Sequence, residues 1–254
     1  MDKSDYFVIW DGMYPDFKSA IKDTSGEGFT GDIYRERSLS AALESLQLLE
    51  TGESIPQFHK QRVTNLPPII ALLLKIHTKI SILDFGGGLG IGYMSLVESL
   101  GSDVSRIEYT ILELEEVCDH GESLLGKKVR YTSTFPKEQF DLVLAASSLQ
   151  YVEDWRNALR EMTFTGTQYI LLSDVFAGRI NPFVTLQNYY GSKIPQWFLN
   201  FEELVQELDQ LGYELIMKSN CPGRRLDSID ILPMQNFPVD SQIRETLNLL
   251  FAKK

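Results

Sequence analysis

The chain has 254 residues, of which 43% are hydrophobic and 23% are charged, and its formal net charge is −11. It is long enough to bury a substantial core, and its composition is typical of one globular domain. The acidic balance, with no run of Lys or Arg longer than two residues, argues against a nucleic-acid partner. The longest apolar stretch, residues 66–76, is too short to cross a bilayer, so we expect no membrane insertion.

Targeting and cysteine patterns narrow the class of protein further. The amino terminus lacks the basic and apolar regions of a secretory signal. The two cysteines, Cys118 and Cys221, have neither the spacing of a metal site nor that of a redox pair. We therefore expect a cytoplasmic protein with free thiols and no metal ligands.

Residues 1–65 have a pattern of their own. Glycines and aromatic residues without a clear period come first, and residues 38–52 then carry apolar side chains at helical spacing until Gly52 ends the helix. A second helix is expected from Asn65, as its cap, to about Ile76. We interpret residues 1–65 as an N-terminal helical cap on the substrate side, and residues 66–254 as the main domain.

From residue 80 onward, short apolar runs alternate with amphipathic helical segments. This alternation predicts an α/β fold with a mostly parallel sheet covered by helices on both faces. Strands are expected at residues 81–85, 108–113, 129–133, 140–147, 168–175, 213–219 and 228–234, and helices at residues 89–100, 153–162 and 200–212.

The carboxyl-terminal part should close this sheet. The last two expected strands are joined by a segment too short for a crossover helix, so they should pair as an antiparallel hairpin. A final helix is expected at about residues 240–251, where Ile243, Leu247, Leu250 and Phe251 share one face. We expect that helix to pack on the core and regard it as a candidate homodimer contact.

Five glycines occupy the seven residues 86–92, directly after the first expected strand. A glycine-rich turn between a strand and a helix lets a ligand approach backbone N–H groups. A triphosphate site would need Lys followed by Ser or Thr after the loop, and a dinucleotide site would need glycines at its first, third and sixth positions. Neither pattern occurs, which disfavours a nicotinamide-dependent dehydrogenase.

The spacing of Asp84, Gly86, Gly88 and Gly90 resembles the first motif of class I S-adenosylmethionine-dependent methyltransferases. The stretch "FDLVLAASSLQYVEDW", residues 140–155, resembles the fourth-strand motif of the same family. The resemblance implies a Rossmann-like class I methyltransferase fold, with S-adenosyl-L-methionine as cofactor and S-adenosyl-L-homocysteine as product. It also implies that the loop faces the methionine half and the sugar of the cofactor.

The same resemblance assigns the remaining cofactor contacts. An acid at the end of the second strand binds the ribose hydroxyls in this family, and Glu113 lies 23 residues after Gly90, near the offset of about 20 in dinucleotide folds. Residues after the third strand meet the adenine. The expected cofactor-binding residues are Asp84, Gly86, Gly87, Gly88, Gly90, Glu113, Leu114, Ser133, Thr134, Ser147 and Ser148.

A closer resemblance concerns the acceptor. The stretches "WDGMYPDFKSA" and "FVTLQNYYGSKIPQWFLN", together with the glycine loop, resemble a family of methyltransferases encoded among surface-polysaccharide (O-antigen-type) biosynthesis genes. That family implies a glycan or polysaccharide-precursor acceptor, or another small molecule, and O-methylation. A non-catalytic protein that uses the same fold to bind the cofactor or a partner is the alternative.

The sequence offers few candidates for a general base. Many relatives place a His just after the fourth strand, whereas this chain has Leu149, Gln150 and Tyr151 there. The remaining candidates are Asp174, which leaves the fifth strand, and His59 in the cap. The long connection of residues 176–199 should border the acceptor, and its Gln187, Tyr189 and Tyr190 suit a hydroxylated molecule.

Overall fold

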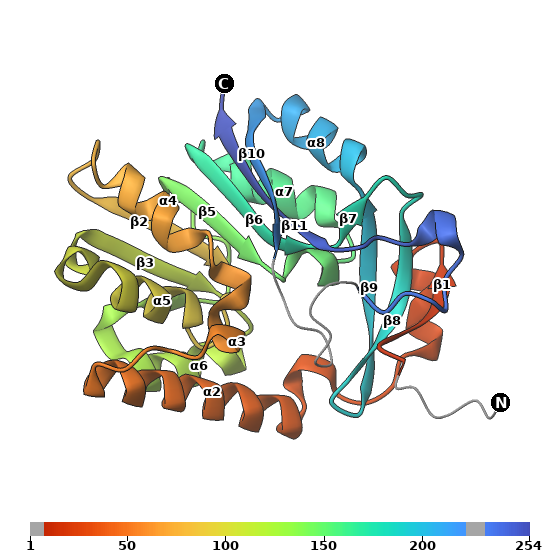
Figure 1. Ribbon diagram of the computed structural model, residues 1–254, viewed down its shortest axis with the longest axis horizontal. Coiled ribbons are helices and arrows are strands. Elements are labelled where there is room, and N and C mark those ends of the chain that lie inside the picture. Colours follow the sequence, from red (N-terminus) through yellow and green to blue (C-terminus); the bar gives the residue numbers. More distant parts are fainter. Residues whose placement is uncertain (1–7, 222–231) are drawn as a thin grey trace.

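The computed structural model describes residues 8–221 and 232–254. Its main sheet has seven strands in the order β10-β11-β6-β5-β2-β3-β4 (Figure 1). Their bounds are β2 (Ile80–Phe85), β3 (Ile107–Leu112), β4 (Arg130–Thr132), β5 (Leu142–Ala146), β6 (Tyr169–Val175), β10 (Tyr213–Cys221) and β11 (Thr246–Lys253). The strands from β6 to β4 are parallel, and β11 runs antiparallel to both β6 and β10.

Helices cover both faces of this sheet, as the strand–helix alternation predicts. One face packs against α4 (Leu66–Leu73), α5 (Ile91–Leu100) and α6 (Glu115–Leu125), and the other against α7 (Trp155–Phe164) and α8 (Phe201–Gln210). Two separate hydrophobic clusters result, one on each face. Asn200 caps α8, because its side chain accepts a hydrogen bond of 2.9 Å from the Glu203 N–H.

The prediction of a carboxyl-terminal helix is wrong, because residues 246–253 form strand β11 in the middle of the antiparallel part of the sheet. Leu249 and Phe251 enter one hydrophobic cluster and Leu250 enters the other, so the strand is buried on both faces. A short, continuously apolar run has no period that separates a buried strand from a helix. The segment belongs to the core and offers no helical face for a dimer contact.

The expected antiparallel hairpin is present, but its second strand is β11. Most of the strand expected at residues 228–234 lies outside the described residues, and Leu232, Pro233 and Met234 are not in a strand. The seven-stranded, mostly parallel sheet with an antiparallel carboxyl-terminal pair is therefore confirmed, with one strand reassigned.

A second sheet joins the amino-terminal region to the long connection after β6. It has the order β1-β8-β9-β7, with β1 (Trp10–Tyr14), β7 (Ala177–Gly178), β8 (Phe183–Tyr189) and β9 (Ser192–Asn200). Trp10 is fully buried at the centre of this contact. Its ring packs edge-on against Phe176 and Phe198, and its indole N–H donates to the Gln196 side chain at 3.1 Å.

One long helix and two short ones complete the amino-terminal region. They are α1 (Phe17–Ala20), α2 (Asp32–Thr51) and α3 (Gln57–Lys60), with the 3-10 turns η1 (Ile21–Asp23), η2 (Gly28–Thr30) and η3 (Gln61–Val63). Further 3-10 turns are η4 (Gly101–Arg106), η5 (Gly126–Lys128), η6 (Leu149–Tyr151) and η7 (Val239–Ser241). Helix α2 contains the expected helix and ends at Gly52, whose φ of 76° is left-handed. Figure 1 shows α2 running beneath α5 and α6.

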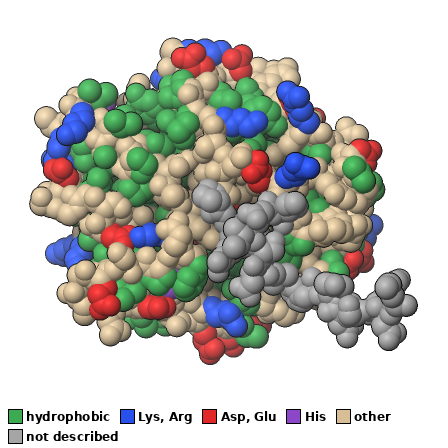
Figure 2. Space-filling model, in the orientation of Figure 1, with side chains coloured by type: hydrophobic (Ala, Val, Ile, Leu, Met, Phe, Trp, Pro, Cys, Tyr) green, Lys and Arg blue, Asp and Glu red, His purple; other side chains and the backbone are tan. Residues whose placement is uncertain are grey.

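On the face shown in Figure 2, Lys and Arg side chains are interspersed with Asp and Glu instead of gathering into one basic patch. Within residues 8–221 and 232–254, none of the helices combines the length and the apolar character that a membrane crossing requires.

Candidate active site

A cavity of about 710 Å³ opens at the carboxyl end of β2. Its walls come from the glycine loop, the start of α6, the first half of α2, the segment around η3, and the tip of the β8–β9 hairpin. The volume falls within the range of about 300–1,000 Å³ that small-molecule sites occupy. Ligands of open parallel sheets bind beyond the carboxyl ends of the strands, and this cavity has that position.

The glycine loop is shaped by backbone angles that favour glycine. Gly86, Gly88 and Gly90 have φ values of 71°, 56° and 86°. A Cβ atom on Gly86 would lie 2.6 Å from the Cβ of Ser148, so Ser148, after β5, leaves no room for a side chain at Gly86. A Cβ on Gly88 would meet nothing within 4 Å, so Gly88 faces the open cavity.

Glu113 lies beside this loop, at the end of β3. Its carboxylate accepts hydrogen bonds from the Gly88 N–H at 3.1 Å and from the Leu114 N–H at 2.8 Å. Burial raises the pKa of Glu113, and these two N–H groups oppose that rise because they stabilise the anion. Each carboxylate oxygen can accept a further hydrogen bond, so the acid can bind the loop and a ligand hydroxyl together.

Asp84, at the end of β2, lines the cavity from below the loop. One of its carboxylate oxygens accepts a hydrogen bond of 2.7 Å from the Tyr109 hydroxyl. The other, Oδ1, is buried and has no hydrogen-bond partner in the part of the chain that the structure describes. Burial raises the pKa of Asp84 to about 7, although the Tyr109 hydrogen bond lowers it. A buried acceptor of this kind suits a cationic or N–H-bearing ligand group.

The other expected cofactor residues lie near the glycine loop or after β4. Leu114 lines the cavity, and Ser148 binds the end of β2 by donating to the Phe85 carbonyl at 2.7 Å. Ser147 has a left-handed φ of 57° and accepts a hydrogen bond of 3.1 Å from the Gln150 side chain. Ser133 and Thr134 are exposed after β4 and do not belong to the cavity wall. Their contact with adenine stays a prediction.

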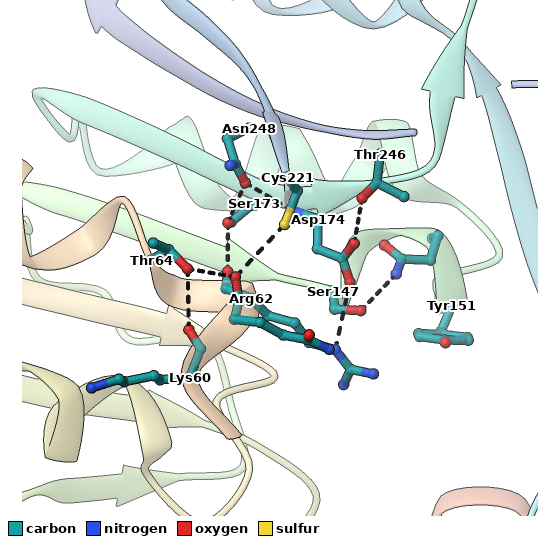
Figure 3. A network of polar contacts seen from close by, with 12 residues as sticks. Lys60, Arg62, Thr64, Ser147, Tyr151, Ser173, Asp174, Cys221, Thr246 and Asn248 are labelled. Carbon is teal, nitrogen blue, oxygen red and sulfur yellow. Dashed lines mark hydrogen bonds and ion pairs between the residues drawn. The ribbon is translucent and has the colours of Figure 1, made fainter. Parts of the chain in front are cut away.

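Asp174 is engaged inside the protein. Its residue is fully buried, with a left-handed φ of 53°. One carboxylate oxygen accepts a hydrogen bond of 2.6 Å from Thr246, and the other lies 3.5 Å from Nε of Arg62 (Figure 3). It is not part of the cavity wall, whereas Arg62 is. This geometry favours a role for Asp174 in holding Arg62 over a role in taking a substrate proton.

His59 has a side chain that is nearly buried yet reaches the cavity wall. The Ser45 hydroxyl donates to the Ala41 carbonyl at 2.7 Å, and the same oxygen lies 3.1 Å from Nδ1 of His59. Because Ser45 donates its single hydroxyl proton to Ala41, Nδ1 of His59 must carry a hydrogen and donate it to the Ser45 oxygen. In the neutral ring, Nε2 is then the unprotonated nitrogen, and it lies 3.6 Å from the Glu44 carboxylate.

The expected acceptor residues come from the β8–β9 hairpin. Tyr189 and Tyr190 line the cavity, and Tyr189 packs against Phe29 and Tyr34 with centroids 5.5 Å and 5.7 Å away. Gln187 is not in the wall, because its side-chain oxygen accepts a hydrogen bond of 2.7 Å from the Tyr151 hydroxyl. Sequence reasoning missed Phe29, Tyr34 and Arg62, which lie in stretches without a recognisable motif or period.

Comparison with known proteins agrees with this geometry. Residues 83–163, from the end of β2 to α7, match the family model described as a methyltransferase domain. The matched residues include the glycine loop, Glu113 and the serines after β5, so the domain assignment and the site geometry concern the same part of the molecule. No curated protein sequence matches the chain significantly.

Solved structures share the fold of this chain. The 1,6-didemethyltoxoflavin-N1-methyltransferase of Burkholderia thailandensis, with bound 1,6-didemethyltoxoflavin and S-adenosylhomocysteine, is 13% identical, with a TM-score of 0.52 over 91% of this chain and 94% of that one. The magnesium protoporphyrin IX methyltransferase of Synechocystis PCC 6803, with bound S-adenosylmethionine, is 10% identical, with a TM-score of 0.52 over 83% and 84%.

A third structure, an S-adenosylmethionine-dependent methyltransferase of Clostridium acetobutylicum, is 11% identical, with a TM-score of 0.50 over 84% of this chain and 97% of that one. At these identities the likeness concerns the fold. The Rossmann-like class I methyltransferase fold expected from the sequence is confirmed.

The open position of Gly88 predicts a selective loss of ligand binding. We expect Gly88→Val to abolish binding of S-adenosylhomocysteine, because the new side chain would project into the cavity. Gly52→Val is a matched control, since Gly52 is left-handed with a φ of 76° and has an equally open Cβ position outside the cavity wall. Both variants should lose about 1–2 kcal/mol of unfolding free energy from left-handed strain. Calorimetric titration separates them, and normal binding by Gly88→Val would contradict the orientation of the loop.

The raised pKa of Asp84 predicts a pH-dependent stability. Because the folded-state pKa of about 7 exceeds the usual 3.8, the native state binds more protons than the unfolded state between these values. The unfolding free energy contributed by this group should therefore fall as pH rises from about 4 to 7, by up to about 4 kcal/mol. Urea unfolding across that range should show a flatter profile for Asp84→Asn, whereas Asp103→Asn, at an exposed carboxylate, should keep the original slope. Equal profiles for all three proteins would rule out the raised pKa.

Proposed function

We propose that the protein is an S-adenosylmethionine-dependent methyltransferase that methylates a hydroxyl group of a small-molecule or glycan acceptor. The observation that carries the proposal is the contact between Glu113 and the Gly88 N–H, which brings the expected ribose acid against the glycine loop. The matched methyltransferase domain and the shared fold support it. A polysaccharide precursor in the cytoplasm is the acceptor that the sequence resemblance favours.

The residues around the loop fit this cofactor. Glu113 would accept hydrogen bonds from two ribose hydroxyls, and Gly88 leaves space for the ligand to lie against the backbone. The buried Oδ1 of Asp84 would accept a hydrogen bond from the ammonium group of the methionine half. Ser133 and Thr134 would border the adenine. When bound, the cofactor supplies an electrophilic methyl group on a positively charged sulfur.

The acceptor half of the cavity would be supplied by the amino-terminal region and the β8–β9 hairpin. Tyr189 and Tyr190 present aromatic faces to the cavity, and Gln187 orients Tyr151 beside them. Aromatic faces with a few polar groups suit a hydroxylated ring. Holding an acceptor in line with the methyl group supplies most of the catalysis in such a reaction, up to about 7–11 kcal/mol.

His59 is the proposed general base. Its Nδ1 is committed to Ser45, which leaves Nε2 to accept the proton of an acceptor hydroxyl, and Glu44 would stabilise the imidazolium that forms. Asp174 is the less suitable group, because Thr246 and Arg62 already occupy its carboxylate and it does not reach the cavity wall. In this proposal Asp174 is a positioning residue.

The cofactor assignment is tested at Glu113. A hydrogen bond to a charged group contributes roughly 1.5–3 kcal/mol, so Glu113→Ala should weaken S-adenosylhomocysteine binding by about 10- to 100-fold or more. Glu116→Ala is the control, since Glu116 lines the cavity but pairs with Arg35 on the surface. Titration calorimetry on the folded variants decides the matter. Equal affinity of Glu113→Ala and the unmodified protein would move the role to another acid.

The base is tested by methyl transfer. His59→Asn should lower the rate by about 10²–10⁴-fold, while cofactor affinity stays unchanged. The assay follows labelled methyl transfer to a mixture of sugar phosphates and nucleotide sugars, with His120→Asn as control because His120 lines the same cavity. An unchanged rate of methyl transfer in His59→Asn would exclude His59 as the base. If the unmodified protein binds the cofactor but labels no acceptor, the non-catalytic alternative is favoured.

A further inference from the structure

Arg62 places a positive charge in the wall of the cavity. It lies in η3, between the amino-terminal region and the main sheet, and its side chain is 46% exposed. Within residues 8–221 and 232–254, Asp174 is the one carboxylate at ion-pair distance from it, on the Nε side. Arg35, another arginine in the wall, pairs with both Asp32 and Glu116. Among the described residues, no other carboxylate pairs with Arg62, so we take its two terminal nitrogens as donors for a ligand.

Buried polar side chains of β6 and β11 hold Arg62 in place. Its carbonyl oxygen accepts a hydrogen bond of 2.5 Å from the Ser173 hydroxyl, which also lies 2.6 Å from the Asn248 side-chain oxygen (Figure 3). Asp174 is held by Thr246, so strands β6 and β11 fix both the main chain and the side chain of Arg62. A guanidinium fixed in this way loses little freedom when it binds a planar or tetrahedral anion.

The surroundings of Arg62 belong to the acceptor half of the cavity. Tyr34, Tyr151 and Tyr189 lie close enough to interact electrostatically with its guanidinium. The Arg37 guanidinium lies 4.8 Å from the centroid of Tyr190, whose ring packs against that of Tyr189. Phenol hydroxyls and guanidinium groups are all donors to anions, and the rings offer faces to an attached sugar or other ring.

The sheet separates Arg62 from the ribose end of the cofactor site. Its partner Asp174 is on β6, which is two strands from the glycine loop on β2 and three strands from Glu113 on β3. With strands about 4.8 Å apart, these separations are roughly 10 Å and 15 Å. Arg62 and Glu113 therefore lie on opposite sides of the glycine loop.

We propose that the acceptor carries an anionic group, a carboxylate or a phosphate ester, which binds to Arg62 beside Tyr34 and Tyr189. This inference rests on the proposed function, because it names the chemistry of the molecule that is methylated. It predicts that the cavity distinguishes charged acceptors from neutral ones of the same shape. Asp174 and Ser173 are positioning residues in this arrangement.

The test uses three matched probes, glucose, glucuronate and glucose 1-phosphate, titrated into protein saturated with S-adenosylhomocysteine. We expect the unmodified protein to bind at least one charged probe about 10-fold or more tightly than glucose. Arg62→Gln should remove that preference and leave S-adenosylhomocysteine affinity unchanged, which also shows that the variant is folded. Arg62→Lys should keep part of the preference, and Arg35→Gln, at an arginine with two partners of its own, should keep all of it.

The outcomes identify the anion as a carboxylate or a phosphate ester. They also distinguish a failure of this inference from a failure of the proposed function. Preference for glucuronate alone identifies a carboxylate, and preference for glucose 1-phosphate alone identifies a phosphate ester. Equal binding of all three probes by the unmodified protein would overturn the inference. So would a parallel loss of S-adenosylhomocysteine affinity in Arg62→Gln, because Arg62 would then hold the cofactor. Failure of the unmodified protein to bind S-adenosylhomocysteine at all would remove the proposed function, and the inference with it.

Discussion

The hydrogen bond from the Gly88 N–H to the Glu113 carboxylate joins the two sequence features on which the site depends. It can form because β2 and β3 are adjacent and parallel, so the glycine loop and the acid leave the same edge of the sheet. The left-handed φ of Gly88 turns its N–H towards the acid and leaves the side-chain position open to the cavity. Replacing either residue would change this contact between the loop and the acid.

The amino-terminal region supplies the opposite wall of the cavity and is secured by its own sheet. Strand β1 pairs with β8, and Trp10 fills the space between Phe176 and Phe198. This contact fixes the β8–β9 hairpin, whose tip carries Tyr189 and Tyr190 into the cavity wall. The parallel sheet therefore positions the cofactor half of the proposed site, and the second sheet positions the acceptor half.

Local patterns allowed most of the main sheet and the cofactor half to be predicted from the sequence. The glycine spacing and Glu113 lie within 30 residues of each other and follow strands with clear apolar runs. The sequence favours a helix where β11 lies, because its apolar residues fit either the helical or the strand period. Burial on both faces of the sheet makes the segment a strand.

Contacts between distant parts of the chain could not be predicted in this way. The pairing of Trp10 with Gln187 in the second sheet joins residues far apart in the sequence. Neither segment has an apolar period that predicts which strand it pairs with. The ion pair of Arg62 with Asp174 is of the same kind, because it depends on where η3 crosses the end of β6. The place of Asp174 at the end of β6 favours a site residue. Its carboxylate is instead engaged by Thr246 and Arg62, and these contacts form only in the packed structure.

Calorimetric titration of the unmodified protein with S-adenosylhomocysteine, beside a titration with NAD, tests the central claim most directly. The account predicts saturable binding of one S-adenosylhomocysteine per chain and no heat from NAD, because the loop lacks the glycine pattern of a dinucleotide site. Saturable binding of NAD without binding of S-adenosylhomocysteine would contradict it.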